Sequence, residues 1–303
     1  MSSTKFDADV IVVGGGPAGL SGAMQLARCL LRVFLFDTGR QRNLPTQEMH
    51  GYLTQKGITP HAWLELARKE AKSYGVHMHD HSVHAVVPFE NGFEVHVNNK
   101  IYRTRKLLMA TGVRDRLPDI PGLEALYGKS VFHCPYCDGW GVRNKALGAF
   151  GYKSKAVPLA LLLRSWSANV TLFTQGPAKI KSDDRQKLER AGITVCNELI
   201  EQLVARANKL THLQMESGER IPCDALFFSN GHTASSTIMA DLGCAHLRTG
   251  AVITDRKQRT RLPGLFVAGD ASIDTHMVSV ACAEGMKAAI TIHQELLTED
   301  GVL

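Results

Sequence analysis

Residues 8–37 read ADVIVVGGGPAGLSGAMQLARCLLRVFLFD, and this stretch decides the fold class of the chain. The apolar runs Val10–Val13 and Val33–Phe36 are short and rich in β-branched or aromatic residues, which is typical of buried parallel strands. Between them, Ala18–Leu30 carries apolar residues at helical spacing. The stretch therefore predicts strand, glycine turn, helix and strand, which is the opening of a doubly wound α/β domain.

The glycine turn itself indicates a ligand. Gly14, Gly16 and Gly19 form a G-x-G-x-x-G motif with Pro17 and Ala18 inside it. In such a turn the second glycine lets the backbone approach a pyrophosphate, and the helix that follows presents free N–H groups to the phosphates. Asp37 ends the second strand 18 residues after the third glycine, close to the spacing of about 20 expected for an acid that binds a ribose. The motif predicts a dinucleotide site and leaves FAD and NAD open.

A second alternation of strands and helices follows in the middle of the chain. The first part continues with an expected helix at Thr59–Tyr74 and a β-hairpin formed by His84–Val87 and Gly92–Val97. A strand is expected at Lys106–Met109. The middle part has expected strands at Ala146–Gly151, Asn169–Phe173, Leu210–Met215 and Ala225–Ser229, and helices at Val157–Ser165 and Ser182–Ala191. A strand at Gly264–Asp270 and a helix at Val278–Leu297 close the chain. We therefore expect two doubly wound three-layer α/β domains of the dinucleotide-binding type, with residues 118–245 inserted in a discontinuous domain of residues 1–117 and 246–303.

Cys134-Pro135-Tyr136-Cys137 brings two sulfurs within reach of each other, as reversible disulfide formation requires. Asp138 follows directly and is placed to act as a general acid or base for a leaving thiolate. One alternative is half of a zinc site with His133 and Cys196 as extra ligands, but the chain has no second C-x-x-C pair, and we expect no metal. The other alternative is a pair of buried thiols without a role.

Four histidines in a row of eight residues also raise the question of a metal: His77, His79, His81 and His84. The first three alternate at strand spacing on a polar stretch, so a solvated strand face is the preferred interpretation.

Composition excludes several classes of protein. The 303 residues are 44% hydrophobic and 21% charged, as in soluble globular proteins, and no apolar run reaches the length that spans a bilayer. The N-terminus lacks the pattern of a signal peptide, and seven scattered cysteines do not suggest a secreted disulfide framework, so we expect a cytoplasmic protein. The net charge of +6 suits an acidic partner or phosphorylated ligands. Without a Lys/Arg-rich run or a nucleic-acid motif, nucleic acid is not expected as a partner, and without a bilayer-spanning run neither is a membrane.

Over nearly its full length the chain resembles the low-molecular-weight thioredoxin reductase family. The residues that carry the resemblance are GGGPAG at 14–19, ATG at 110–112, CPYCDG at 134–139 and GLFVAGD at 264–270. The resemblance implies a homodimer with FAD at the first glycine turn, Asp270 on the ribityl chain, and the helix after it close to the flavin ring. Cys137 would face the flavin, and Cys134 would attack the disulfide of a substrate such as thioredoxin. The cofactor residues implied beyond the glycine turn and Asp37 are Thr111, Gly112, Gly269, Asp270, Met277 and Val278, with Arg42 and Asn43 either at the adenosine half or in a solvated turn.

The chain departs from this family where NADPH should bind. The loop after the strand at 146–150 reads Gly151-Tyr152-Lys153-Ser154-Lys155-Ala156, with a lysine in place of the middle glycine. The arginine-bearing stretch that grips the 2′-phosphate is replaced by residues 174–177, TQGP. The resemblance includes subfamilies that lack the nicotinamide site. Some of them are reduced by ferredoxin, a deeply branching cyanobacterial type has the same loss, and others oxidise small dithiols with oxygen. The oxidases often have histidine where this chain has Asp138, which favours the reductase branch.

The expected function is therefore FAD-dependent reduction of a protein disulfide, with ferredoxin as a candidate donor and NADPH doubtful. Three alternatives stay open: a degenerate NADPH site in which Lys153 and Lys155 meet the phosphates, a dithiol oxidase, and a flavin redox sensor without turnover.

Overall fold

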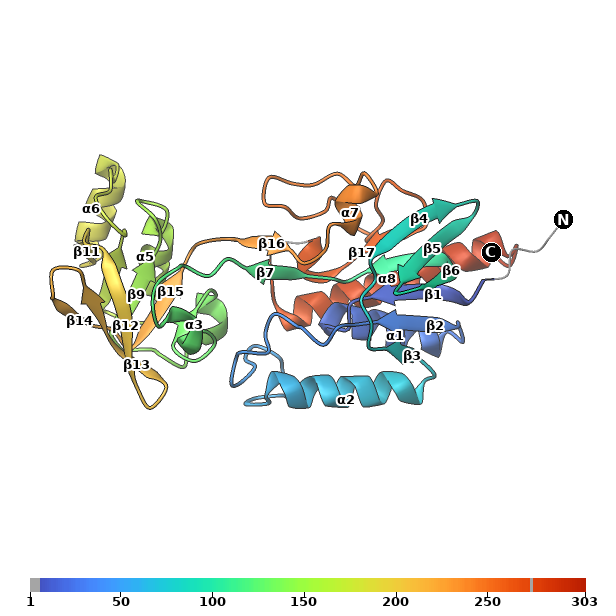
Figure 1. The fold of residues 1–303 in the computed structure, drawn as a ribbon, viewed down its shortest axis with the longest axis horizontal. Helices are drawn as coiled ribbons and strands as arrows, with labels where there is room; N and C mark the ends of the chain where they lie inside the picture. Colours follow the sequence, from blue (N-terminus) through green and yellow to red (C-terminus); the bar gives the residue numbers. More distant parts are fainter. Residues whose placement is uncertain (1–5, 273–274) are drawn as a thin grey trace. The chain divides into compact units, whose positions relative to one another are not determined.

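A computed structural model of the chain describes residues 6–272 and 275–303. The chain divides into two compact units. The first takes in the residues up to 44, 51–114, and 233 onward, and the second takes in residues 45–50 and 115–232. Both units are α/β, as the sequence predicts (Figure 1).

The first unit is built on a seven-stranded sheet in the order β3-β2-β1-β6-β5-β4, with β17 also paired to β6. Strands β1, β2, β3, β6 and β17 run parallel, and β4 and β5 pair antiparallel. The strands are β1 (Ala8–Val13), β2 (Val33–Phe36), β3 (His77–His79), β4 (Ala85–Phe89), β5 (Gly92–Val97), β6 (Lys100–Met109) and β17 (Leu265–Val267). The strand predicted at Val33–Phe36 has these same bounds, whereas β6 begins six residues before the predicted Lys106.

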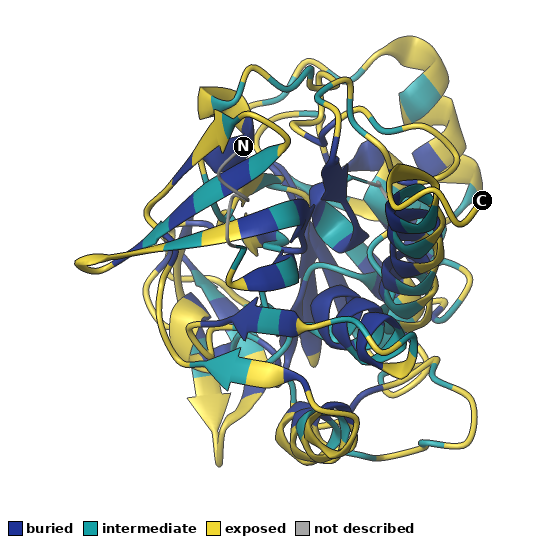
Figure 2. Cartoon of the chain, turned by 90° about the vertical axis from the view of Figure 1, so that its right-hand side faces the viewer, coloured by how far each residue is buried: buried dark blue, intermediate teal, exposed yellow. Residues whose placement is uncertain are grey.

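Helices cover one face of this sheet. They are α1 (Pro17–Arg28), α2 (Pro60–Ser73) and α8 (Val278–Glu299), and they share a core with the sheet residues Val10, Val12, Leu35 and Leu108. Helices α1 and α8 lie side by side (Figure 1). They approach so closely that a Cβ added at Gly285 would lie 2.0 Å from the Ala18 carbonyl oxygen. The core on the opposite face includes Val86, Phe93 and Val95 of β4 and β5, together with Ile238 and Met239 of α7 (Ile238–Asp241). Buried residues concentrate in the strands and on one side of the helices (Figure 2).

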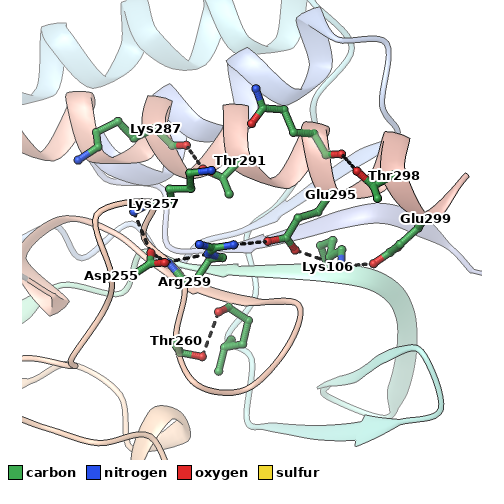
Figure 3. A network of polar contacts seen from close by, with 12 residues as sticks. Lys106, Asp255, Lys257, Arg259, Thr260, Lys287, Thr291, Glu295, Thr298 and Glu299 are labelled. Carbon is green, nitrogen blue, oxygen red and sulfur yellow. Dashed lines mark hydrogen bonds and ion pairs between the residues drawn. The ribbon is translucent and has the colours of Figure 1, made fainter. Parts of the chain in front are cut away.

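An ion-pair network fastens the C-terminal part of α8 to the sheet (Figure 3). Lys106 of β6, whose side chain is 7% exposed, binds Glu299 closely and lies 3.4 Å from Glu295. Arg259 reaches Glu295 at 3.8 Å from the loop before β17 and pairs with Asp255 at 2.8 Å. The helix that begins at the predicted flavin site is therefore anchored at its far end.

The second unit has a parallel sheet in the order β11-β10-β9-β15-β8. Its strands are β8 (Val131–Phe132), β9 (Leu147–Phe150), β10 (Val170–Phe173), β11 (Thr194–Cys196) and β15 (Ala225–Phe228). One face packs on α5 (Val157–Leu163) and α6 (Ser182–Arg190). The other face packs on α3 (Leu123–Leu126) and on an antiparallel sheet of β12 (Ile200–Arg206), β13 (Lys209–Met215) and β14 (Arg220–Pro222). This is the predicted three-layer arrangement.

The two crossings between the units pair with each other as β7 (Val113–Asp115) and β16 (His232–Ala234). The second crossing comes before residue 233, and not at the expected boundary after residue 245. The reason is that Ile238 and Met239 of α7 are buried in the core of the first unit. Residues 45–50 cluster with the second unit, since a Cβ at Gly128 would lie 2.5 Å from the Pro45 carbonyl.

Among the helices that the structure describes, none is both long and apolar enough to cross a bilayer.

Candidate active site

The three glycines of the first turn, Gly14, Gly16 and Gly19, differ in whether the surrounding protein leaves room for a side chain. Gly14 has φ +107°, and a Cβ there would meet the Ala110 carbonyl oxygen at 2.2 Å. A Cβ at Gly19 would meet the Gly14 carbonyl oxygen at 1.8 Å, so both positions need glycine for packing within the protein. At Gly16 the nearest atom to an added Cβ is Gln41 Cγ, 3.8 Å away. The protein itself does not require glycine at position 16, and the space beside that backbone is open.

Two further observations show that these residues fit a dinucleotide. The Thr111 hydroxyl, just after β6, is buried and has no hydrogen-bond partner among the residues described, and such an orphaned group is costly unless a ligand satisfies it. Gly112 is in the left-handed region at φ +65°, and no atom lies within 4 Å of a Cβ added to it. The N-cap of α1, Gly16, offers no side-chain oxygen to the first turn, and Pro17 and Ala18 begin the helix. Its N–H groups are available to an anionic ligand.

Asp37 lies beside the glycine turn, as its spacing predicts. Its buried carboxylate accepts a hydrogen bond from Gln41 Nε2 at 2.7 Å and forms a close ion pair with Arg68 of α2. A Cβ at Gly15 would meet the Asp37 carboxylate at 2.6 Å. No spacing in the sequence indicates that Arg68 pairs with Asp37, because Arg68 lies 31 residues away on a different element.

Arg42 points inward and is not part of a solvated turn. Its Nη1 donates to Asp270 Oδ2 at 3.0 Å and lies 2.7 Å from His276 Nδ1. The Arg42 side chain is only 14% exposed. Asp270 belongs to the short 3₁₀ helix η1 (Gly269–Ala271) after β17, while Met277 is the N-cap of α8 and Val278 its first residue. The structure therefore joins Arg42 to Asp270, which lies 228 positions further along the chain; Asn43 follows Arg42 in the same turn.

Cys134 and Cys137 form a disulfide, with their Cα atoms 5.3 Å apart. Cys134 caps α4 (Pro135–Asp138), and its sulfur accepts a hydrogen bond from the Cys137 N–H at 3.1 Å. Both cysteines are partly buried. The sulfurs are thus held in the geometry that reversible thiol–disulfide exchange requires.

Asp138 ends the same helix. Burial raises the pKa of its carboxyl from 3.8 to about 7. At neutral pH it is therefore poised between its two protonation states, which is where a general acid or base is most effective.

A match to the family model "Pyridine nucleotide-disulphide oxidoreductase" spans residues 8–289. The chain belongs to this family. Its curated relatives include the thioredoxin reductase tcpT of Claviceps purpurea, 30% identical over 98% of this chain and 97% of the relative. A thioredoxin reductase of Listeria innocua is 27% identical over 89% of this chain and 88% of the relative.

Solved structures agree with this assignment. The crystal structure of HlmI superposes with a TM-score of 0.93 at 34% identity, covering 97% of this chain and 93% of the other. An oxidoreductase of Agrobacterium tumefaciens superposes with a TM-score of 0.89 at 30% identity, covering 96% and 99%. This oxidoreductase is accordingly a flavin-dependent enzyme of the thioredoxin reductase type, and its family implies FAD as the cofactor.

One buried acid in this oxidoreductase, Glu284, forms hydrogen bonds to the turn that carries Asp270. Glu284 of α8 accepts hydrogen bonds from the Gly269 N–H at 2.8 Å and from the Ser272 hydroxyl at 3.2 Å. Gln258 Nε2 donates to its other oxygen at 3.2 Å. Glu284 therefore fixes the turn that carries Asp270. No local sequence signal identifies it, because its partners come from two other segments, the loop at Gln258 and the turn at Gly269–Ser272.

The loop where family members bind a nicotinamide nucleotide is closed on itself. Lys153 has φ +60°, and its N–H donates to the Thr174 carbonyl at 2.8 Å. The N–H groups of Lys155 and Val157 donate to carbonyls of the same loop. The Gln175 amide bonds the backbone of Ile200, with its Oε1 3.0 Å from the Ile200 nitrogen. These backbone donors are used within the protein rather than turned to a phosphate.

The histidine tract differs in part from its predicted solvated face. His77 and His81 are exposed, but the His79 ring stacks on Phe36 with 4.8 Å between ring centroids. Within 6–272 and 275–303, no group of three or more acidic, histidine or cysteine side chains is arranged to hold a metal ion.

Proposed function

We propose that this oxidoreductase exchanges electrons between FAD and the Cys134–Cys137 pair, and between that pair and a disulfide substrate of the thioredoxin kind. The observation that carries the proposal is the disulfide at Cys134 and Cys137 followed by a carboxyl group with a pKa of about 7. FAD, when bound, supplies a reservoir for two electrons. The residues that would hold it are the glycine turn 14–19, Asp37, Arg42, Asn43, Thr111, Gly112, Gly269, Asp270, Met277 and Val278.

The protein residues then carry out thiol exchange. In the reduced pair, Cys134 attacks the substrate disulfide and forms a mixed disulfide, and Cys137 resolves it to release a dithiol product. Asp138 holds the proton that Cys137 loses and regains in each cycle. The supporting observation is the position of Asp138 next to Cys137 on the same short helix.

We further propose that electrons do not enter from NADPH. A pyrophosphate needs close backbone approach and free N–H groups, whereas Lys153 stands in place of the middle glycine and its N–H is donated to Thr174. Helix α5 has only seven residues and begins after this loop. A one-electron protein donor such as ferredoxin is the candidate, and the charge of +6 suits an acidic partner of that kind.

The same closed loop favours a second candidate function, in which electrons flow in the opposite direction. A dithiol substrate could then load the Cys134–Cys137 pair, and oxygen would take the two electrons and two protons to give hydrogen peroxide. Such an oxidase needs no nicotinamide site.

One experiment separates these candidates. The oxidised holoenzyme is mixed anaerobically with NADPH, NADH, reduced ferredoxin or a dithiol, and the bleaching of the flavin absorbance is followed by stopped flow. We expect ferredoxin to bleach the flavin fast enough to support thioredoxin reduction, and NADPH to bleach it far more slowly. Bleaching by NADPH at the rate of turnover would refute the proposed donor, and bleaching by the dithiol alone, followed by peroxide release in air, would favour the oxidase.

A further inference from the structure

Four lysines extend from two neighbouring loops of the second unit. Lys153 and Lys155 follow β9, and Lys179 and Lys181 follow β10. The two loops are joined, because the Lys153 N–H donates at 2.8 Å to the carbonyl of Thr174, the first residue after β10. All four lysines are exposed to solvent, and we call them the lysine edge.

The charges of the lysine edge are not neutralised from within the protein. Among residues 6–272 and 275–303, no carboxylate forms an ion pair with any of these four ammonium groups. The acids nearest in sequence, Asp183 and Asp184, lie in the first turn of α6, where negative charge stabilises the helix. Asp184 pairs instead with Lys187, at 3.7 Å. The positive charge of the lysine edge is therefore left to a partner from outside.

The dithiol begins at the same edge of the sheet. Strands β8, β15, β9 and β10 run parallel, so their carboxyl ends lie at one edge, where open α/β sheets bind their ligands. Cys134 lies two residues after the end of β8. Strand β8 is two strands away from β9, which is about 10 Å at the usual strand spacing. A molecule that brings its disulfide to Cys134 therefore comes close to the lysine edge.

The separation favours a protein over a small molecule. A standard protein interface buries about 800 Å² on each partner, which is a patch roughly 30 Å across. Such a patch covers both the dithiol and the lysine edge, whereas a small disulfide bound at Cys134 covers the dithiol alone. The partner that complements unpaired ammonium groups carries carboxylates.

We propose that the lysine edge docks the disulfide substrate, and that this substrate is a protein with a cluster of Asp and Glu side chains beside its disulfide. The inference rests on the proposed function, in which the Cys134–Cys137 pair reduces a disulfide of the thioredoxin kind. Complementary charge of this sort raises the rate of encounter and leaves the exchange chemistry itself unchanged.

Three other interpretations of the lysine edge make different predictions. A solvated surface affects no reaction of the enzyme. A docking surface for an acidic electron donor affects only the reduction of the flavin by that donor. A site for nucleotide phosphates affects only the reduction of the flavin by NADPH.

The test measures the reaction of the reduced enzyme with its acceptor, so it needs no physiological donor. The flavin of the full-length holoenzyme is reduced photochemically without air. The enzyme is then mixed by stopped flow with an oxidised thioredoxin of net negative charge, or with 2-hydroxyethyl disulfide, which is small and uncharged. Reoxidation of the flavin gives the second-order rate constant for each acceptor, as two electrons and two protons pass to the disulfide and convert it to a dithiol.

The test variant is Lys179→Glu/Lys181→Glu, and the matched control is Arg206→Glu/Lys209→Glu, which makes the same change of charge in the same unit. Arg206 and Lys209 are exposed at the turn between β12 and β13. This turn lies toward the amino end of β8, since the N–H of the next residue, Leu210, donates to the Ser130 hydroxyl directly before β8.

We expect Lys179→Glu/Lys181→Glu to lower the rate constant for thioredoxin about tenfold at low ionic strength. Added salt should shrink the difference, because it screens charges that solvent reaches. The rate constant for 2-hydroxyethyl disulfide should not change, and the control should react like the wild type with both acceptors. Lys179→Gln/Lys181→Gln should give a smaller decrease of the same kind, and it keeps the test valid if the charge-reversed variant fails to fold.

Equal rate constants for thioredoxin in the lysine variants, the control and the wild type would overturn the inference. It would also be overturned if the lysine variants slowed only the reduction of the flavin by ferredoxin or by NADPH, measured in the same apparatus. A reduced wild-type enzyme that passes electrons to neither thioredoxin nor 2-hydroxyethyl disulfide would give a different pattern. That result would remove the proposed function, and the docking role with it.

Discussion

Replacing Asp138 by asparagine removes an ionisable group from the dithiol turn while keeping the size of the side chain. Burial raises the pKa of this carboxyl from 3.8 to about 7. Since one pH unit corresponds to about 1.4 kcal/mol, the ionised carboxylate costs the folded state up to about 4 kcal/mol. Solvent at the partly buried residue reduces this value, so we take it as an upper limit.

The sign of the effect follows from the direction of the shift. Because the pKa of Asp138 is raised, the folded state binds the carboxyl proton more tightly than the unfolded state does. The contribution of this proton to stability is fully present below about pH 4 and is lost as the pH rises through about 7. The wild type should therefore lose stability over that interval relative to Asp138→Asn. Catalysis should change in the opposite sense, because removing a positioned acid or base typically slows turnover about 10²- to 10⁴-fold.

The assay compares urea midpoints and turnover rates of the two holoproteins between pH 5 and 8. Glu216→Gln, which changes an exposed carboxylate of the same unit, serves as the control. We expect the variant to gain stability relative to wild type as the pH rises, and to lose the kinetic transition near pH 7. Parallel stability profiles together with unchanged turnover at saturating substrate would refute the reasoning.

Four further predictions follow from single contacts. Cys137→Ser should keep FAD, lose disulfide turnover and trap a mixed disulfide at Cys134, visible on a non-reducing gel; normal turnover would contradict the exchange mechanism. Gly16→Ala should weaken FAD binding in a fluorescence titration but leave the circular dichroism of the folded protein intact, whereas Gly19→Ala should destabilise the fold itself, since its Cβ would lie 1.8 Å from a carbonyl oxygen; equal effects of the two would count against an open ligand space at Gly16. Glu284→Gln should raise the dissociation constant of FAD about tenfold, because charged hydrogen bonds to the Gly269 turn contribute about 1.5–3 kcal/mol; an unchanged constant would show that the turn holds without them. Lys106→Met should lower the free energy of unfolding by about 1–3 kcal/mol, a value between those of buried and exposed ion pairs, measured by urea denaturation; no change would mean that α8 needs no clamp.

Local patterns were enough to predict much of the architecture. The βαβ opening, including the strand at Val33–Phe36, has a clear pattern of apolar residues, because its side chains must face one core. The helix at Pro60–Ser73 is marked by the proline at its first position. The short strands β8 and β11 were missed, whereas β3 lies where the alternation of His77 and His79 predicts a strand. With two or three residues each, β8 and β11 have no periodicity to read and exist only because a neighbouring strand pairs with them.

The sequence by itself determined the chemistry of this protein: a glycine turn for a dinucleotide and a C-x-x-C pair for exchange, each written in a few neighbouring residues. The tertiary structure decided what surrounds them. It joined Arg42 to Asp270, placed Arg68 on Asp37, and set Glu284 behind the Gly269 turn. It also decided the protonation of Asp138, since a pKa depends on how much water folding removes from the carboxyl. Contacts between residues 15 to 228 positions apart leave no spacing rule in the sequence, because the intervening chain has no set length.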